Sequence, residues 1–183
     1  ELNVRNALAA VTVAKHCGLN DGQIQNAFDT FEGIKRRMET RGEAEGIIVV
    51  DDFAHHPTAI KETLKALKMK YPTRRLWAIF EPRSNTTRRD VFQEELANAL
   101  GDADQVVVSA VAKLEQIPKS ERLDPLKLMD TLRTSRVEAA YISAVPSIIE
   151  HLKTHAQKGD VVCVLSNGSF EGIHEQLLEA LRA

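Results

Sequence analysis

Four short runs of apolar residues recur along the chain without alternating polar positions, and they constrain its fold more than any other feature. They span residues 47–50, 76–80, 106–108 and 161–165, and a weaker strand signal lies at 137–141. Segments with apolar residues at helical spacing separate the runs. Such runs are typical of strands covered on both faces, as in a parallel sheet. The repeated strand–helix units predict a doubly wound α/β domain, with a mostly parallel sheet flanked by helices.

The first 39 residues have a different character. Apolar residues at helical spacing predict a helix that ends at Gly18, and Asn20 or Asp21 is suited to cap a second helix. Two helices are too few to hold a core, so we expect residues 1–39 to be the end of a neighbouring domain and residues 40–183 to form the α/β domain. The chain opens in helical pattern at Glu1 rather than at a Met, which indicates a fragment of a longer protein.

Composition argues against several classes of protein. The 183 residues include 24 Lys and Arg against 26 Asp and Glu, a net charge of −2, whereas proteins that bind nucleic acids or membrane surfaces are usually basic. The two cysteines, Cys17 and Cys163, do not suggest a disulfide scaffold. No signal peptide opens the chain, and no apolar run reaches the roughly 18 residues that span a bilayer. A reducing, cytoplasmic location is therefore expected.

Polar segments follow three of the apolar runs directly. They comprise residues 51–58, 81–86 and 166–170, and we call them the first, second and third tips. In open parallel sheets, ligands bind outside the carboxyl ends of the strands. All three tips are expected to emerge at that edge, so their convergence predicts a ligand-binding site there.

The first tip carries carboxylates and histidines. Pro57 suits the first position of a helix, which would put His56 near the N-cap, where free amides favour an anion. Asp51 and Asp52 stand where a carboxylate could accept ribose hydroxyls or hold a metal-bound water. The alternative is that Asp52 caps a turn and that His55 and His56 are solvated. A zinc site is a weaker alternative, because adjacent histidines rarely point into one coordination sphere.

The other two tips carry groups suited to anions. Arg83 offers a planar fork for a carboxylate or phosphate, and a surface salt bridge is the alternative. Ser166, Asn167 and Gly168 form a turn before a helix, whose amides suit a phosphate or a peptide carboxylate, and a plain glycine turn is the alternative. The G-x-x-x-x-G-K-[ST], G-x-G-x-x-G and G-x-S-x-G motifs are all absent. The chain therefore has binding groups, and we assign it no catalytic and no metal-binding residue.

Three segments resemble the Mur ligases, the ATP-dependent amide ligases of peptidoglycan synthesis. The first tip, Asp-Asp-Phe-Ala-His-His-Pro-Thr, is similar to the signature that opens their C-terminal domain. Residues 3–10 look like the family's H-N-x-x-N-A-L-A-A segment near the end of the central ATPase domain, and residues 33–39 look like its G-x-x-x-R-[FM]-E junction. The resemblance implies a Rossmann-like C-terminal domain preceded by a short helical tail of the ATPase domain.

The second and third tips are most similar to one branch of this family. That branch joins the salvaged tripeptide L-alanyl-γ-D-glutamyl-meso-diaminopimelate to UDP-N-acetylmuramic acid in peptidoglycan recycling. The implied reaction uses ATP and Mg²⁺: the muramate carboxylate becomes an acyl phosphate, and the tripeptide amine displaces phosphate. In the family, the central domain carries the phosphate loop, the catalytic carboxylate and the magnesium ligands, and the N-terminal domain holds the UDP-sugar. This chain alone is therefore expected to be inactive.

Two other functions stay open. One is that of the UDP-N-acetylmuramate:L-alanine ligase, whose second tip usually reads F-Q-P-H-R-Y-[TS]-R-[TL], a pattern that this chain lacks. The other is a non-catalytic nucleotide- or peptide-binding module. Residues 3–10 argue against that module, because the segment makes sense as the end of an ATPase domain.

The resemblance also implies roles for individual residues. Asn3 and Asn6 match positions that line the adenine site, with Leu2 where the family usually has His. Arg37 matches the junction arginine that reaches the nucleotide, and Asp52 matches the carboxylate that takes the ribose. The positions expected to bind the incoming amino acid or peptide are those of His55, His56, Arg83, Ser166 and Asn167.

Overall fold

A computed structural model describes residues 2–183, with side chains from Val4 onward. The chain divides into two compact units, one reaching to Lys35 and the other spanning Arg36–Ala183. The second unit thus begins four residues before the start that the sequence predicts for the α/β domain. That residues 1–39 are the end of an ATPase domain stays a prediction. Within residues 2–183, no helix combines the length and apolarity needed to cross a membrane.

The first unit consists of helix α1 (Leu2–His16) and helix α2 (Asp21–Asp29). Gly18 follows α1 with a φ of +88°, a conformation that favours glycine, as predicted. Asn20 caps α2: its side chain accepts from the Gln23 amide at 2.9 Å, and the Gln23 side chain accepts from the Asn20 amide at 3.0 Å. Among the described side chains of this unit, Ile24 alone is buried. The unit therefore has almost no core of its own.

The second unit is built on a six-stranded sheet. Its strands are β1 (Glu39–Ala44), β2 (Ile47–Asp52), β3 (Leu76–Phe80), β4 (Gln105–Val108), β5 (Glu138–Tyr141) and β6 (Val161–Leu165). The spatial order is β1-β2-β6-β3-β4-β5, and every neighbouring pair is parallel except β1 with β2. The predicted fold class, a mostly parallel α/β sheet, is confirmed.

The antiparallel strand β1 was not predicted from the sequence. It forms a hairpin with β2 through Glu45 and Gly46, whose φ angles of +50° and +74° are those of a tight hairpin turn. Its sequence, Glu-Thr-Arg-Gly-Glu-Ala, has no apolar run, because at the edge of the sheet it is only partly covered. Backbone pairing with β2, rather than burial, fixes this strand.

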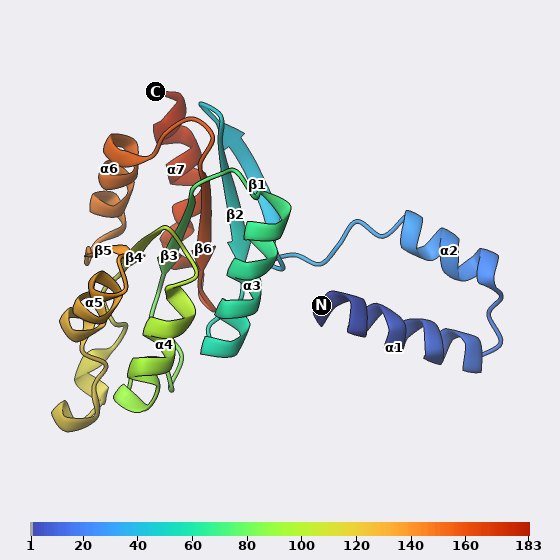
Figure 1. Cartoon of the computed structure of the whole chain (residues 1–183), viewed down its shortest axis with the longest axis horizontal. Coiled ribbons are helices and arrows are strands. Elements are labelled where there is room, and N and C mark those ends of the chain that lie inside the picture. Colours follow the sequence, from blue (N-terminus) through green and yellow to red (C-terminus); the bar gives the residue numbers. More distant parts are fainter. Residues whose placement is uncertain (1) are drawn as a thin grey trace. The chain divides into compact units, whose positions relative to one another are not determined.

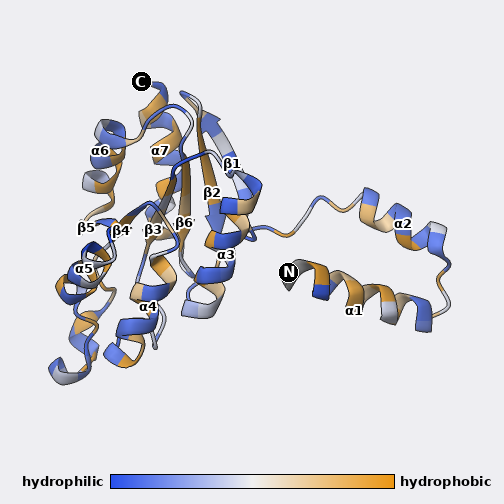
Figure 2. Cartoon of the chain, viewed as in Figure 1, coloured by the Kyte–Doolittle hydropathy of each residue, from blue (hydrophilic) through white to orange (hydrophobic). Residues whose placement is uncertain are grey.

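Helices cover both faces of the sheet. Helices α3 (Pro57–Lys70), α4 (Gln93–Leu100) and α5 (Pro125–Thr134) lie on one face, and α6 (Val145–His155) and α7 (Ile173–Arg182) on the other (Figure 1). Alternate residues of each strand enter the two cores: in β6, Cys163 joins the first and Val162 the second. Burial raises the pKa of the Cys163 thiol, which is a core residue as predicted. Figure 2 shows hydrophobic residues concentrated on the strands between the helices.

The chain reverses direction across the sheet at β6. It runs outward from β2 through β3 and β4 to β5 with its helices on one face, and then returns over the other face to insert β6 between β2 and β3. Crossovers of one hand require this change of face when the direction reverses. The loop after β6 therefore leads to the opposite face from the loops after β2 and β3. A crevice for ligands is expected at such a switch point, at the carboxyl ends of the strands.

Candidate ligand-binding site

The three polar tips meet at the carboxyl edge of the sheet, as the sequence predicted. Leu165, the last residue of β6, lies in register with Asp52 of β2 and with Phe80 of β3. The ladder continues past the strand ends, because the Ser166 amide donates to the Asp52 carbonyl at 3.2 Å and the Glu81 amide donates to the Leu165 carbonyl at 3.0 Å. The tips thus start side by side at the switch point.

The carboxylate of Asp52 is occupied by internal donors. One oxygen accepts from the Met38 amide at 2.7 Å, and the other accepts from the Ala54 amide at 2.8 Å and from the Thr63 hydroxyl at 3.3 Å. Asp52 is only 3% exposed. This geometry is that of a turn cap, the alternative that the sequence left open. A contact between Asp52 and a ribose stays a prediction.

The two histidines of the first tip lie in different surroundings. His56 is the N-cap of α3 and Pro57 is its first residue, as predicted; Nδ1 of His56 accepts from the Thr58 amide at 3.3 Å. Nδ1 of the half-buried His55 lies 2.9 Å from the Phe53 carbonyl, so in the neutral ring this nitrogen donates and Nε2 is left as an acceptor. No cluster of three or more metal-capable side chains occurs in the part of the chain that the structure describes.

The second and third tips interlock through their side chains. The Ser166 hydroxyl donates to the buried carboxylate of Glu81 and accepts from the Gly168 amide at 2.8 Å. Arg83 packs against Gly168 so closely that a Cβ on Gly168 would lie 2.5 Å from its Cδ. Its guanidinium lies 3.4 Å from Glu81, and the side chain stays 46% exposed. The buried Oδ1 of Asn167 has no hydrogen-bond partner among the described residues.

Arg36 joins the start of the second unit to the third tip. Its Nη2 donates to the carbonyls of Ser166 at 2.6 Å and Gly168 at 2.8 Å, and its Nε lies 3.3 Å from the Asp51 carboxylate. Arg37, the arginine that the sequence favoured, is exposed, and its guanidinium lies 5.7 Å from the Phe53 ring centre. The sequence reasoning did not assign Arg36 to the site. The short basic run was the only signal for it, and that run cannot tell which arginine turns inward.

Asp51 is a buried carboxylate that lies beside His174 and Arg36. Burial by itself would raise its pKa, but His174 at 3.3 Å and the guanidinium of Arg36 outweigh that effect and lower the pKa below its ordinary value. His174 belongs to α7 and is 5% exposed. The sequence reasoning missed it, because a single histidine in an amphipathic helix gives no signal of its partner.

A comparison with family models matches residues 36–168 to the Mur ligase, glutamate ligase domain. The match begins at Arg36 and includes all three tips up to Gly168. The chain belongs to the Mur ligase family. The resemblance inferred from its motifs is confirmed.

Other Mur ligases resemble nearly the whole chain. A UDP-N-acetylmuramate–L-alanyl-γ-D-glutamyl-meso-2,6-diaminoheptandioate ligase of Escherichia coli is 38% identical over 99% of this chain, and a UDP-N-acetylmuramate–L-alanine ligase of Acaryochloris marina is 35% identical over 97%. The chain spans 38% of the length of each of these relatives. The crystal structure of a murein peptide ligase from Psychrobacter arcticus matches 98% of this chain at 42% identity and a TM-score of 0.75, and the chain covers 37% of it.

A related domain has also been crystallised as such. It comes from a putative UDP-N-acetylmuramate:L-alanyl-γ-D-glutamyl-meso-diaminopimelate ligase of Haemophilus ducreyi and is 33% identical, with a TM-score of 0.62. It matches 79% of this chain over 99% of its own length.

The predicted adenine-site residues lie in the first unit. Asn6 is an exposed residue of α1. The side chain of Asn3 lies outside the described residues. The roles of both in this Mur ligase chain stay predictions.

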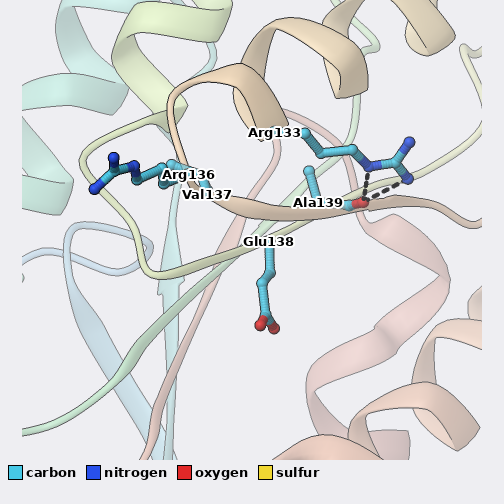
Figure 3. A pocket seen from close by; sticks show the side chains of 5 residues that line it. All are labelled: Arg133, Arg136, Val137, Glu138 and Ala139. Atoms are coloured by element: carbon cyan, nitrogen blue, oxygen red, sulfur yellow. Dashed lines mark hydrogen bonds between the residues drawn. The ribbon is translucent and has the colours of Figure 1, made fainter.

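Two surface hollows of the Mur ligase chain are lined by residues outside the three tips. One, of about 380 Å³, is lined by residues 133 and 136–139, at the amino end of β5 and so at the opposite end of the sheet (Figure 3). There Arg133 donates to the Ala139 carbonyl at 2.9 Å, and Glu138 points away from it. A second, of about 460 Å³, is lined by residues 90, 91, 93–95, 122, 124 and 127. Neither hollow includes a predicted site residue.

Proposed function

We propose that this chain is the acceptor-binding part of an ATP-dependent ligase that joins L-alanyl-γ-D-glutamyl-meso-diaminopimelate to UDP-N-acetylmuramic acid in peptidoglycan recycling. The muramate carboxylate is first phosphorylated, and the free amine of the tripeptide then attacks the acyl phosphate. The chain contributes to this reaction by holding the tripeptide amine in place, since correct placement of two reactants removes much of a reaction's entropic barrier. The reaction is expected in the cytoplasm.

The observation that carries this proposal is the half-exposed side chain of Arg83 at the switch point. The tripeptide has several carboxylates, and an arginine fork binds a carboxylate through two parallel hydrogen bonds. Gly168 packs against the side chain of Arg83, and Glu81 lies 3.4 Å from one guanidinium nitrogen, yet the side chain stays about half exposed. Ser166 and Asn167 on the neighbouring tip, with His55 and His56 on the first, complete the proposed acceptor site.

The nucleotide is proposed to lie nearer the start of the second unit. Arg37 is exposed and has no carboxylate partner among the described residues, so its charge is available to a phosphate. Asn6 and Asn3 are proposed to line the adenine, and Asp52 the ribose. The described residues offer no cluster for Mg²⁺, so its ligands are proposed to lie in another part of the whole ligase.

Phosphate release by the whole ligase tests the proposal. Release is expected to require ATP, UDP-N-acetylmuramate and the tripeptide together, and to yield the amide product in equal amount. Rapid release with free L-alanine in place of the tripeptide would instead favour the UDP-N-acetylmuramate:L-alanine ligase. That second candidate has a specific basis, because ligases of that name are also about one third identical to this chain.

A further inference from the structure

The side chain of Arg36 contacts two backbone carbonyls and one buried carboxylate. One nitrogen, Nη2, donates to two carbonyls of the third tip, those of Ser166 and Gly168, and Nε faces the buried Asp51. The two carbonyls are two residues apart, so both peptide groups must turn toward the same guanidinium. Arg36 therefore fixes the conformation of residues 166–168 from a position 130 residues earlier in the sequence.

The backbone of Arg36 is held equally firmly. Its φ of +58° is uncommon for a residue with a Cβ. Its amide donates to the Glu39 carboxylate at 2.7 Å, and its carbonyl accepts from the Phe53 amide at 2.9 Å. This conformation aims the side chain of Arg36 inward at the third tip, whereas the next residue, Arg37, stays exposed.

The third tip in turn supports Arg83. The stem of Arg83 packs where Gly168 has no Cβ, and Ser166 holds Glu81, which lies beside the guanidinium of Arg83. A change in the turn at 166–168 would therefore move both supports of Arg83. A displacement of about 1 Å at a positioning group is enough to reduce a rate by about a hundredfold.

We infer that Arg36 is a positioning residue for the acceptor peptide, although it lies beside the arginine proposed for the nucleotide. It holds the turn at residues 166–168 and so places Arg83. This role rests on the proposed function, because it assigns Arg83 to the tripeptide. The two adjacent arginines then have different roles: Arg36 positions the acceptor site, and Arg37 binds the nucleotide.

Arg36→Lys is the test variant, since lysine keeps the positive charge toward Asp51 but lacks the planar guanidinium with its several fixed donors. Arg75→Lys is a matched control at the opposite end of the sheet. Arg75 donates to the His155 carbonyl at 2.8 Å and pairs with buried Asp160 at 2.7 Å, and its side chain is 31% exposed against 29% for Arg36. Both variants lose a guanidinium that joins a buried carboxylate to a backbone carbonyl.

Amide hydrogen exchange of the chain tests the first link. In Arg36→Lys, the Gly168 amide is expected to exchange at least about tenfold faster than in the wild type, because the turn opens locally. In Arg75→Lys, this amide should be unchanged. Equal exchange at Gly168 in both variants would overturn the role of Arg36, whatever reaction the ligase catalyses.

Steady-state kinetics of the whole ligase test the second link. Arg36→Lys should raise the KM for the tripeptide about tenfold or more and leave the KM for ATP within about twofold, and Arg75→Lys should change neither. A shift in the KM for ATP without one for the tripeptide would place Arg36 on the nucleotide side and overturn the inference. A wild-type ligase that does not use the tripeptide would overturn the proposed function, a result distinct from unchanged exchange at Gly168.

Discussion

Replacing Asp52 separates a structural role from a role in ligand binding. The Asp52 carboxylate accepts from the amides of Met38 and Ala54 at 2.7 and 2.8 Å in a site where it is 3% exposed. In Asp52→Ala, both amides lose their acceptor. Each unpaired buried group costs about 1–3 kcal/mol, so the free energy of unfolding of the second unit should fall by about 2–6 kcal/mol. Asp52→Asn keeps one acceptor oxygen and should cost about half as much.

Urea unfolding of the chain measures this loss directly. Trp77 is the single tryptophan and is 1% exposed, so its fluorescence reports unfolding of the sheet. Thr63→Val is the matched control, since it removes only the third and longest bond to the carboxylate, at 3.3 Å, and should cost less than about 1 kcal/mol.

The opposite pattern would refute this reasoning. If the free energy of unfolding of Asp52→Ala lies within about 0.5 kcal/mol of the wild-type value, as is usual for surface substitutions, the carboxylate does not hold the turn. A rise in the KM for ATP in the whole ligase, together with that unchanged stability, would assign Asp52 to the ribose alone. If Asp52 serves both purposes, stability and the KM for ATP change together.

Four further outcomes are expected. Arg83→Lys should weaken use of the tripeptide about tenfold, or about 1.4 kcal/mol, and leave saturation by ATP nearly unchanged in steady-state kinetics. Gly168→Ala should raise the KM for the tripeptide, because the new Cβ displaces Arg83. The amide hydrogen-exchange rates of the neighbouring residues should stay at their wild-type values, because Arg36 still holds the turn. In the folded protein the pKa of Asp51 lies below its ordinary value of 3.8. The ionised carboxylate therefore contributes its full stabilisation above about pH 5, and this stabilisation is lost as the pH falls through the folded pKa. Asp51→Asn should flatten the acid side of a curve of stability against pH. The 183-residue chain alone should release no phosphate from ATP with both other substrates present, because it lacks the phosphate-loop motif.

The sequence specified the buried strands and hence the position of the site. A parallel strand covered on both faces must be apolar along its length, so β2, β3 and β6 are visible as apolar runs. The carboxyl ends of parallel strands share one edge, which made the convergence of the tips predictable before any contact was known. Strand β1 escaped prediction for the converse reason: an edge strand held by backbone pairing needs no apolar pattern.

Residue types did not predict how the side chains within the site are oriented. Arg36 and Arg37 are adjacent and chemically identical, yet a positive φ turns the first toward two carbonyls and leaves the second exposed. Asp52 has the residue type that a ribose contact requires, but the same oxygens suit the amides of Met38 and Ala54. A motif therefore indicates which groups reach a site, and the internal donors around each group determine how much of its hydrogen-bonding capacity is left for a ligand. By that criterion, Arg83, half exposed and held by Glu81 through one nitrogen at 3.4 Å, is the side chain of the tips best suited to bind a carboxylate.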